Sequence, residues 1–407
     1  MESLKELYRI GPGPSSSHTL AVRNACLLYL QRYSDYPCYF VELCGSLGLT
    51  GRGHMSDKVI ESVFGKERVL IKFNREMAHN HPNTMIFHTI DSNVLSNEMV
   101  IYSTGGGAIE VEGEPSLVDK NVYPHKNLRE IMDFCEINNY NFAQYVFHFE
   151  PDIKPYLHKV LNQMVTTIRG GLRKDGVLPG ELKVVRVAKK LYRKAFDCEE
   201  ANIKEKLLIS SYAYAAMEQN ASGEMVVTAP TLGSCGVLSA MLMYYYEKGI
   251  SKEILINALA VAGIFGNIVK RNATISGAVG GCQAEIGTAC SMAAAFAGYV
   301  EGLSNRKIEF AAEIAMEHNL GLTCDPVGGY VQVPCIERNG QAVLRSLDSM
   351  IYAKYLGEIR ENIVTFDMIV EVMNYTGQKI AMELRETSLG GLAEIVPMYK
   401  KEGPSDC

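Results

Sequence analysis

Three cysteines lie in glycine- and proline-rich segments in the C-terminal half of the chain. Cys282 follows two glycines in GGCQAEIG, Cys324 lies in LTCDPVGG, and Cys335 follows a proline in VQVPCIERN. Glycine and proline let a backbone wrap closely around a bulky ligand. Three thiolates from separated loops can bind a metal ion or an iron–sulfur cluster from one side and leave one coordination position open. Such a centre is a Lewis acid, so the pattern indicates chemistry rather than electron transfer.

A fourth cysteine, Cys407, is the final residue of the sequence and follows a short Gly-Pro-Ser-Asp segment. A thiolate on such a tail could occupy the open position and leave it again. Two alternatives stay open: Cys407 belongs to a disordered tail, and the other three cysteines are small buried apolar residues. The spacing is neither that of a CxxC zinc site nor that of a ferredoxin.

The segment GPSSSHT, residues 13–19, combines hydroxyl groups and backbone N–H groups and leads into a predicted helix. The positive end of a helix attracts anions, so this segment is suited to a substrate carboxylate. His18 within it could act as a base or as a carboxylate ligand. The alternative is an ordinary N-cap. The candidate carboxylate contacts are Ser15, Ser16, Ser17 and Thr19.

Two further histidines are candidate catalytic residues. His54 lies in a glycine turn, GRGH, and His81 precedes a proline that restricts the direction of the backbone. A lone histidine is more often a hydrogen-bonded structural residue, and a helix N-cap or a solvated helix end would equally explain most of the other polar candidates. The remaining candidate substrate contacts are Asn83, Thr228, Lys270 and Asn272.

Two kinds of folding unit are expected to position these residues. The first part of the chain mixes strand-like runs with helices and predicts an α+β domain over residues 1–150. Helices are expected at 19–33 and 56–64, and Gly105–Gly107 is expected to be a turn that ends a strand, since it lacks the lysine of a nucleotide-binding loop. The expected strands cover 38–47, 68–74, 84–90 and 99–106.

Strand signals nearly vanish after residue 150, which predicts an all-α catalytic domain over residues 151–407. Several of its segments are apolar on nearly all sides, so we expect them to be buried. A linker is expected at 112–126 or near residue 150. The expected helices cover 156–169, 182–195, 203–219, 235–246, 252–271, 284–300, 307–320, 342–358 and 365–383.

Composition narrows the class of protein. The formal net charge is -6 and there is no basic block, so neither a nucleic acid nor a membrane surface is an expected partner. The N-terminus lacks the apolar core of a signal peptide, and the run 288–300 is too short to span a membrane. We therefore expect a cytoplasmic protein whose 11 cysteines are reduced thiols or metal ligands.

Several long motifs resemble those of the iron–sulfur L-serine dehydratases, which are L-serine ammonia-lyases. GCQAEIGTACSMAAA, EHNLGLTCDPVGGYVQVPCIERN, TAPTLGSCG, GVLPGELKV and ETSLGGLA resemble the catalytic module of that family. IGPGPSSSHT, GRGHMSDK, HPNTM and STGGG resemble its other module. The resemblance covers nearly the whole chain and implies that both modules are fused here.

The resemblance implies a [4Fe–4S] cluster on Cys282, Cys324 and Cys335, with Cys407 as a cap that the substrate displaces. It also implies that Cys290, in the first motif, is a packing residue. Cys235 stands where the family usually has a small apolar residue, so a further thiol could lie near the cluster. The implied reaction converts L-serine to pyruvate and ammonia, with catalytic roles for residues of the histidine motifs.

Three alternatives remain open at this stage. The same chemistry could act on L-threonine or on L-cysteine, because a methyl group is a weak basis for discrimination. The third alternative is a non-catalytic protein in which the metal is structural or senses redox state. A homodimer is expected from the family and because most cytosolic enzymes form symmetric oligomers.

Overall fold

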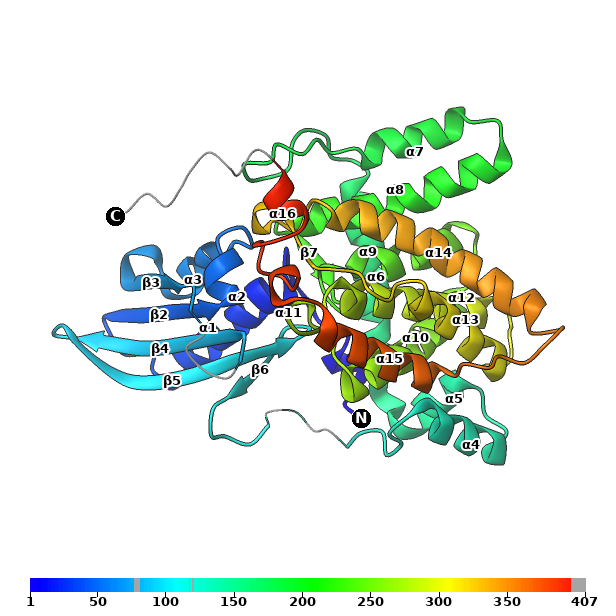
Figure 1. Ribbon diagram of the computed structural model, residues 1–407, viewed down its shortest axis with the longest axis horizontal. Coiled ribbons are helices and arrows are strands. Elements are labelled where there is room, and N and C mark those ends of the chain that lie inside the picture. The colour runs from blue at the N-terminus through cyan, green and yellow to red at the C-terminus, as the bar shows by residue number, and fades with distance from the viewer. Residues whose placement is uncertain (77–80, 117, 119–120, 397–407) are drawn as a thin grey trace.

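The computed structural model describes residues 1–76, 81–116, 118 and 121–396. A mixed sheet with its helices forms one end of the molecule, and a larger bundle of helices forms the other (Figure 1). The α+β fold of the first part and the helical fold of the second confirm the predicted fold class. The position of the domain boundary at residue 150 stays a prediction.

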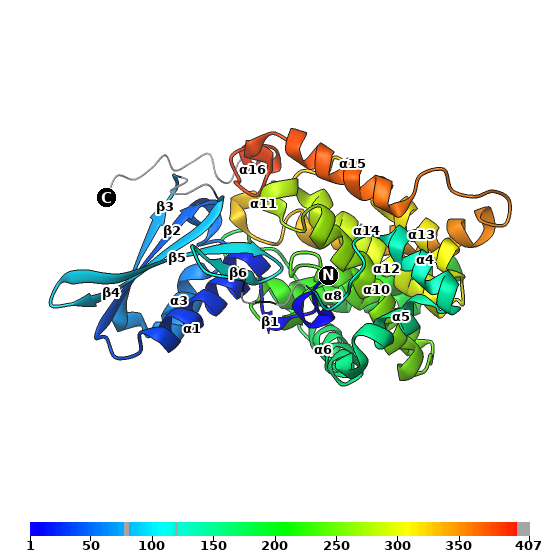
Figure 2. The ribbon, with the colours of Figure 1, turned by 90° about the horizontal axis from the view of Figure 1, so that it is seen from below.

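The sheet of the N-terminal part has five strands, of which only β2 and β3 are parallel neighbours. Alternate side chains of β2 point to one face, where Val41 and Leu43 are fully buried beneath α1 and α3 (Figure 2). Tyr29 of α1 stacks on Phe87 of β4 within this core. The sheet elements are β3 (Val69–Asn74), β2 (Cys38–Gly45), β4 (Asn83–Asp91), β5 (Val94–Gly105) and β6 (Ala108–Val111), with α1 (Ala21–Arg32), α2 (Ser46–Thr50) and α3 (Ser56–Phe64).

The helical part is built around α10 and α12, which pack against each other along their lengths. Alanines at 289, 293, 294, 295 and 297 of α12 are fully buried, and their small side chains permit close helix packing. Surrounding helices complete the bundle. Its elements are α4 (Leu128–Asn138), α5 (Phe142–Phe149), α6 (Lys154–Gly171), α7 (Ala188–Asp197), α8 (Ala201–Ala221), α9 (Cys235–Glu247), α10 (Lys252–Asn272), α11 (Gly277–Gly280), α12 (Thr288–Val300), α13 (Asn305–Glu317), α14 (Cys335–Leu356), α15 (Phe366–Lys379) and α16 (Leu392–Ile395).

Helix α10 is longer than the apolar run at 288–300. In the described part of the chain it alone is long and apolar enough to cross a membrane by length and composition. Most of its residues are buried inside the bundle, with Leu259, Ala260, Val261 and Phe265 fully covered. This burial is the usual environment of the central helix of a globular core.

The first residues of the chain connect the two parts. Leu4, Leu7 and Tyr8 are buried in the core of the helical part. The next residues form β1 (Ile10–Pro12), which pairs with β7 (Met225–Val227). This pairing directs the following loop, residues 13–19, to the junction between the two parts of the molecule.

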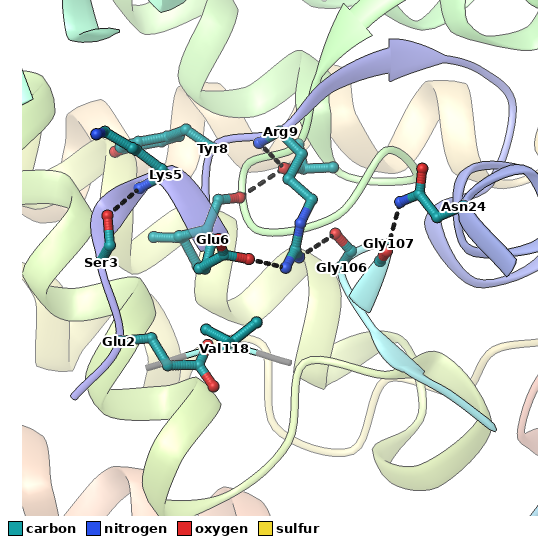
Figure 3. Close-up of polar contacts among 12 residues, drawn as sticks. Glu2, Ser3, Lys5, Glu6, Tyr8, Arg9, Asn24, Gly106, Gly107 and Val118 are labelled. Atoms are coloured by element: carbon teal, nitrogen blue, oxygen red, sulfur yellow. Dashed lines mark hydrogen bonds and ion pairs between the residues drawn. The ribbon is translucent and has the colours of Figure 1, made fainter. Parts of the chain in front are cut away.

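Arg9 and Asn24 fix the turn between β5 and β6 to this junction. The Arg9 guanidinium donates a hydrogen bond to the Gly106 carbonyl at 2.9 Å and pairs with Glu6, and the Asn24 amide donates to the Gly107 carbonyl at 3.0 Å (Figure 3). Gly105, Gly106 and Gly107 all have positive φ angles. The predicted turn at the end of a strand is thus confirmed, and it has a structural role.

Candidate active site

A buried cavity lies at the junction of the two parts. The three cysteines from the glycine-rich motifs line it together. Ser15 and His54 reach it from the N-terminal part of the chain. Its charged lining residues are Glu285, Asp325, Arg338 and Glu386, all from the helical part and the segment that follows α15.

Local backbone structure places each cysteine at the end of a loop. Cys282 precedes a π-helical turn, Gln283–Gly287, that leads into α12, and Cys335 is the first residue of α14. Cys324 lies in the loop between α13 and α14, where its N–H donates to the Leu384 carbonyl at 2.8 Å. The segment near residue 385 therefore holds Cys324 in place, although it lies outside the motifs that contain the three cysteines.

Burial raises the pKa of all three thiols, that of Cys282 to about 11 and those of Cys324 and Cys335 well above their usual value. Nearby charge adds to this: Glu386 raises the pKa of Cys324 further and Cys282 raises that of Cys335, whereas the Arg338 guanidinium lowers that of Cys282. Buried thiols of this kind become thiolates when a metal centre supplies positive charge. Arg338 is itself held by the Thr323 carbonyl at 2.5 Å.

Glycine forms the cavity wall beside the thiols, and the cavity has a volume of about 20 Å³. A Cβ atom placed on Gly277 would lie 3.1 Å from the Cys324 sulfur and 2.8 Å from Glu285 Oε2, so only glycine leaves this space free. Within the described residues, no three His, Cys, Asp or Glu side chains are arranged to hold a single metal ion. A multi-iron cluster binds each thiolate through a different iron and requires a wider arrangement. The three thiols line one cavity.

His18 and His54 form a buried pair beside the cavity, with their ring centroids 4.3 Å apart. His18 Nε2 lies 3.2 Å from Ser46 Oγ, and its Nδ1 lies 3.6 Å from Glu386 Oε1. Burial lowers the pKa of His18 to about 4 and that of His54 well below its usual value. Both rings are therefore neutral at pH 7 and can accept a proton. His54 Nδ1 is buried with no hydrogen-bond partner among the described residues.

The hydroxyl loop is brought to the cavity mainly through Ser15. Ser15 Oγ caps the following helical turn by accepting from the His18 N–H at 3.2 Å. Thr19 Oγ1 donates to the His54 carbonyl at 2.7 Å, and Ser16 Oγ accepts from the Leu232 N–H at 2.6 Å. Ser17 is buried in the same turn. Ser15 therefore caps the helical turn, which was the alternative explanation, and also lines the cavity.

His81 and Asn83 lie near the site without lining the cavity. His81 Nδ1 accepts from the Asn83 N–H at 3.1 Å, and its ring packs near Tyr102. Asn83 is fully buried opposite Gly45 in the sheet, one residue from Ser46. Neither polar atom of the Asn83 side chain has a hydrogen-bond partner within the described part of the chain.

Three candidate substrate contacts have their side chains engaged away from the cavity. Thr228 Oγ1 donates to the Leu7 carbonyl at 2.5 Å and accepts from the Arg9 N–H at 2.7 Å. Lys270 pairs with Glu2 at 2.5 Å. Asn272 donates to a backbone carbonyl at residue 126. Cys407 lies outside the described residues.

Two other cysteines occupy packed positions. Cys290 donates to the Ala342 carbonyl at 3.3 Å and accepts from the Ser346 hydroxyl at 3.1 Å, which agrees with the packing role expected for it. Cys235 is buried against the Met217 sulfur at 3.8 Å and does not line the cavity. The thiols that line the cavity are therefore those of the three glycine- and proline-rich motifs.

Sequence reasoning missed the acidic residues of the cavity. Glu285 accepts from the Thr231 hydroxyl at 2.7 Å, and Glu386 lies beside His18. Burial raises the pKa of both carboxyl groups, and the charge of Glu285 raises that of Glu386 further. Both residues lie within motifs that were singled out for other reasons, GCQAEIG and ETSLGGLA. A carboxylate within an apolar motif was the signal that could have identified them.

Buried histidines, acids and thiols around a cavity between two folded parts are typical of an enzyme that acts on a small molecule. Comparison with known families agrees with this class. Residues 3–67 match the serine dehydratase beta chain, and residues 67–393 match the serine dehydratase alpha chain. The chain belongs to the serine dehydratase family, with both parts in one polypeptide.

Relatives with both parts in one chain are similar over nearly their full length. A protein of Haemophilus influenzae named L-serine dehydratase is 36% identical, over 97% of this chain and 99% of its own. L-serine dehydratase 1 of Escherichia coli is 35% identical over the same shares. An L-serine dehydratase of Streptomyces coelicolor is 33% identical over 96% of this chain and 98% of its own.

Proposed function

We propose that this protein is an L-serine dehydratase that converts L-serine to pyruvate and ammonia. The observation that carries the proposal is one cavity that is lined by three cysteines and by the buried, neutral His54, against which the His18 ring packs. The full-length similarity to relatives of that name supports the choice of substrate.

The cofactor of this proposal is a [4Fe–4S] cluster held by Cys282, Cys324 and Cys335. When bound with one open iron, the cluster supplies a Lewis acid for the departing β-hydroxyl group. Cys407 is proposed as the cap of that position in the absence of substrate. If so, Cys407→Ser retains the iron and becomes more sensitive to oxygen, whereas loss of the iron would indicate a permanent ligand.

His54 is the proposed base for the α-proton of L-serine. It lines the cavity, it is neutral at pH 7, and its Nδ1 is free of hydrogen bonds within the described residues. His18 supports the ring of His54 and is held by Ser46. Ser15 and the neighbouring N–H groups of the capped turn are suited to the substrate carboxylate. The aminoacrylate that leaves then tautomerises to an imine, which water hydrolyses to pyruvate and ammonia.

The ligand assignment is tested by two matched substitutions. Cys282→Ala should abolish cluster binding, because it removes a cavity thiol. Cys290→Ala removes an equally buried thiol eight residues further along and should retain full iron and sulfide content. Iron and sulfide analysis after anaerobic purification provides the measurement. Equal iron content in the two variants would contradict the assignment.

Turnover of L-serine, L-threonine and L-cysteine under identical anaerobic conditions tests the substrate. The proposal predicts the highest kcat/KM for L-serine, with pyruvate and ammonia formed in equal amounts. If the metal is instead held by four permanent ligands and no ammonia is released, the protein is the non-catalytic alternative, in which the metal is structural or senses redox state. We also propose a homodimer and a cytoplasmic location.

A further inference from the structure

Glu386 is held from both parts of the molecule so that its side chain enters the cavity. Its N–H donates to the Cys324 carbonyl at 2.6 Å, and its own carbonyl accepts from Ser46 Oγ at 2.8 Å. The residue is only 6% exposed. The backbone position is therefore fixed by the helical part on one side and by the sheet part on the other.

The Glu386 carboxyl group contacts the backbone at Ala278, which partly offsets the rise of its pKa on burial, but one of its two oxygens lacks a partner. Its Oε1 lies 3.6 Å from His18 Nδ1, a distance too long for a hydrogen bond. Its Oε2 is buried with no hydrogen-bond partner among the described residues. A buried carboxylate oxygen without a donor is costly, so a site of this kind indicates that a donor arrives with a ligand.

A second carboxyl group, that of Glu285, lies beside Glu386 and makes a positively charged ligand group more favourable here. Both carboxyl groups face the position that a Cβ atom on Gly277 would occupy: Glu285 Oε2 lies 2.8 Å from it and Glu386 Oε2 lies 3.4 Å from it. Arg338 lines the cavity too, but its guanidinium donates to the Thr323 carbonyl and to Asp325. His18 and His54 are neutral at pH 7. Burial raises the pKa of both carboxyl groups, although Arg338 lowers that of Glu285, and a positively charged ligand group in this space would lower both.

We propose that Glu386 binds the α-ammonium group of the amino-acid substrate, with Glu285 as its acidic neighbour. This inference rests on the proposed function and adds a determinant of specificity to it. An ammonium group has three N–H donors and no acceptor, which suits an unpartnered carboxylate oxygen. The substrate carboxylate is then placed at Ser15, which lines the same cavity. The site selects 2-amino acids over 3-hydroxy acids that lack the amino group.

Glu386→Gln in the anaerobic, cluster-loaded protein tests the inference, because glutamine keeps the shape and removes the charge. KM for L-serine should rise at least roughly 30-fold, as for the loss of one member of a buried charge pair. The change in kcat should be much smaller. The inhibition constant of 3-hydroxypropanoate, which is L-serine without its ammonium group, should stay unchanged. Glu386→Asp keeps the charge and should raise KM less than Glu386→Gln does.

Glu383→Gln is the matched control, since Glu383 is an exposed glutamate in the same segment and should leave KM unchanged. An unchanged KM in Glu386→Gln would overturn the inference, as would an equal weakening of L-serine and 3-hydroxypropanoate. A loss confined to kcat would also overturn it, by assigning Glu386 to the chemical step. Wild-type protein that fails to turn over L-serine would contradict the proposed function itself, and this result is visible before any variant is compared. If Glu386→Gln does not fold, the same comparison is made with Glu386→Met, which also removes the charge.

Discussion

At the scale of single residues, burial determines the chemistry that is available. His18 and His54 are buried beside the cavity and have lowered pKa values. Both rings at the cavity are therefore neutral bases at pH 7, whereas an exposed histidine is half protonated at about pH 6.5. Buried carboxyl groups and thiols have raised pKa values for the same reason.

Replacing the proposed base should mainly slow the chemical step. His54→Gln should lower kcat roughly 100-fold or more, since general base catalysis contributes about that factor, with a small effect on KM. Steady-state kinetics of the cluster-loaded variant provide the measurement, with iron content as the control. A kcat within a few-fold of the wild type would assign the base to another residue.

His18 should make the stability of the fold depend on pH. Its pKa is about 4 in the folded protein and near 6.5 when unfolded, so the unfolded chain alone gains a proton between these values. Stability should therefore fall as the pH decreases from 6.5 to 4, by up to about 3 kcal/mol from this residue. Urea unfolding at pH 7 and at pH 4.5 measures this change in the free energy of unfolding.

The control for this pH effect is the exposed His158. The free energy of unfolding of His18→Gln should fall less than that of the wild type over this pH interval. That of His158→Gln should fall by the same amount as in the wild type. The same loss in all three proteins would show that His18 is not responsible.

Sequence motifs predicted which thiols meet at the cavity, because each of them lies beside glycine or proline. They did not predict Glu386, whose role depends on contacts with Cys324 and Ser46 that are distant in the chain. They also singled out Thr228 and Lys270, which are polar residues beside recognisable motifs. In the folded protein their side chains are engaged by the first residues of the chain instead.

At the scale of elements, the pairing of β1 with β7 fixes the hydroxyl loop. Thr228 supports this pairing through two buried hydrogen bonds. Thr228→Val keeps the shape but leaves both backbone partners without the hydroxyl, which should destabilise the fold by about 1–3 kcal/mol. KM for L-serine should not change. Chemical unfolding and kinetics of the same preparation check this, and a raised KM at unchanged stability would place Thr228 at the substrate.

Long, regular elements were predictable and short or remote pairings were not. The predicted strands correspond to β2, β3, β4 and β5, whose side chains alternate or are β-branched. Three-residue strands such as β1 and β7 carry no pattern, and they pair across more than 200 residues. Helices α4 and α5 were also missed, although Asn141 and Gln144 form a capping box that is visible in the sequence.

At the scale of the whole molecule, α15 presents an apolar stripe to the surface. Met368, Val372 and Tyr375 are 53%, 43% and 63% exposed, and their spacing places them on one face of the helix. Apolar residues in such a row suit a symmetric interface between two copies of the chain. Figure 1 shows α15 along the outside of the bundle.

Sedimentation should therefore detect a species of twice 45.0 kDa for the wild type. Val372→Glu, at the centre of the stripe, should shift it toward the monomer because a charge would be buried at the interface. Glu371→Gln, on the neighbouring exposed position, is the control and should leave the dimer intact. A monomeric wild type, or a dimer that tolerates Val372→Glu, would contradict this interface.

The most direct test of the account is the visible spectrum of the protein purified without oxygen, recorded before and after addition of L-serine. The account predicts broad iron–sulfur absorption that changes when L-serine binds at the open position. A colourless protein that contains zinc, or an iron–sulfur spectrum that L-serine leaves unchanged, would contradict it.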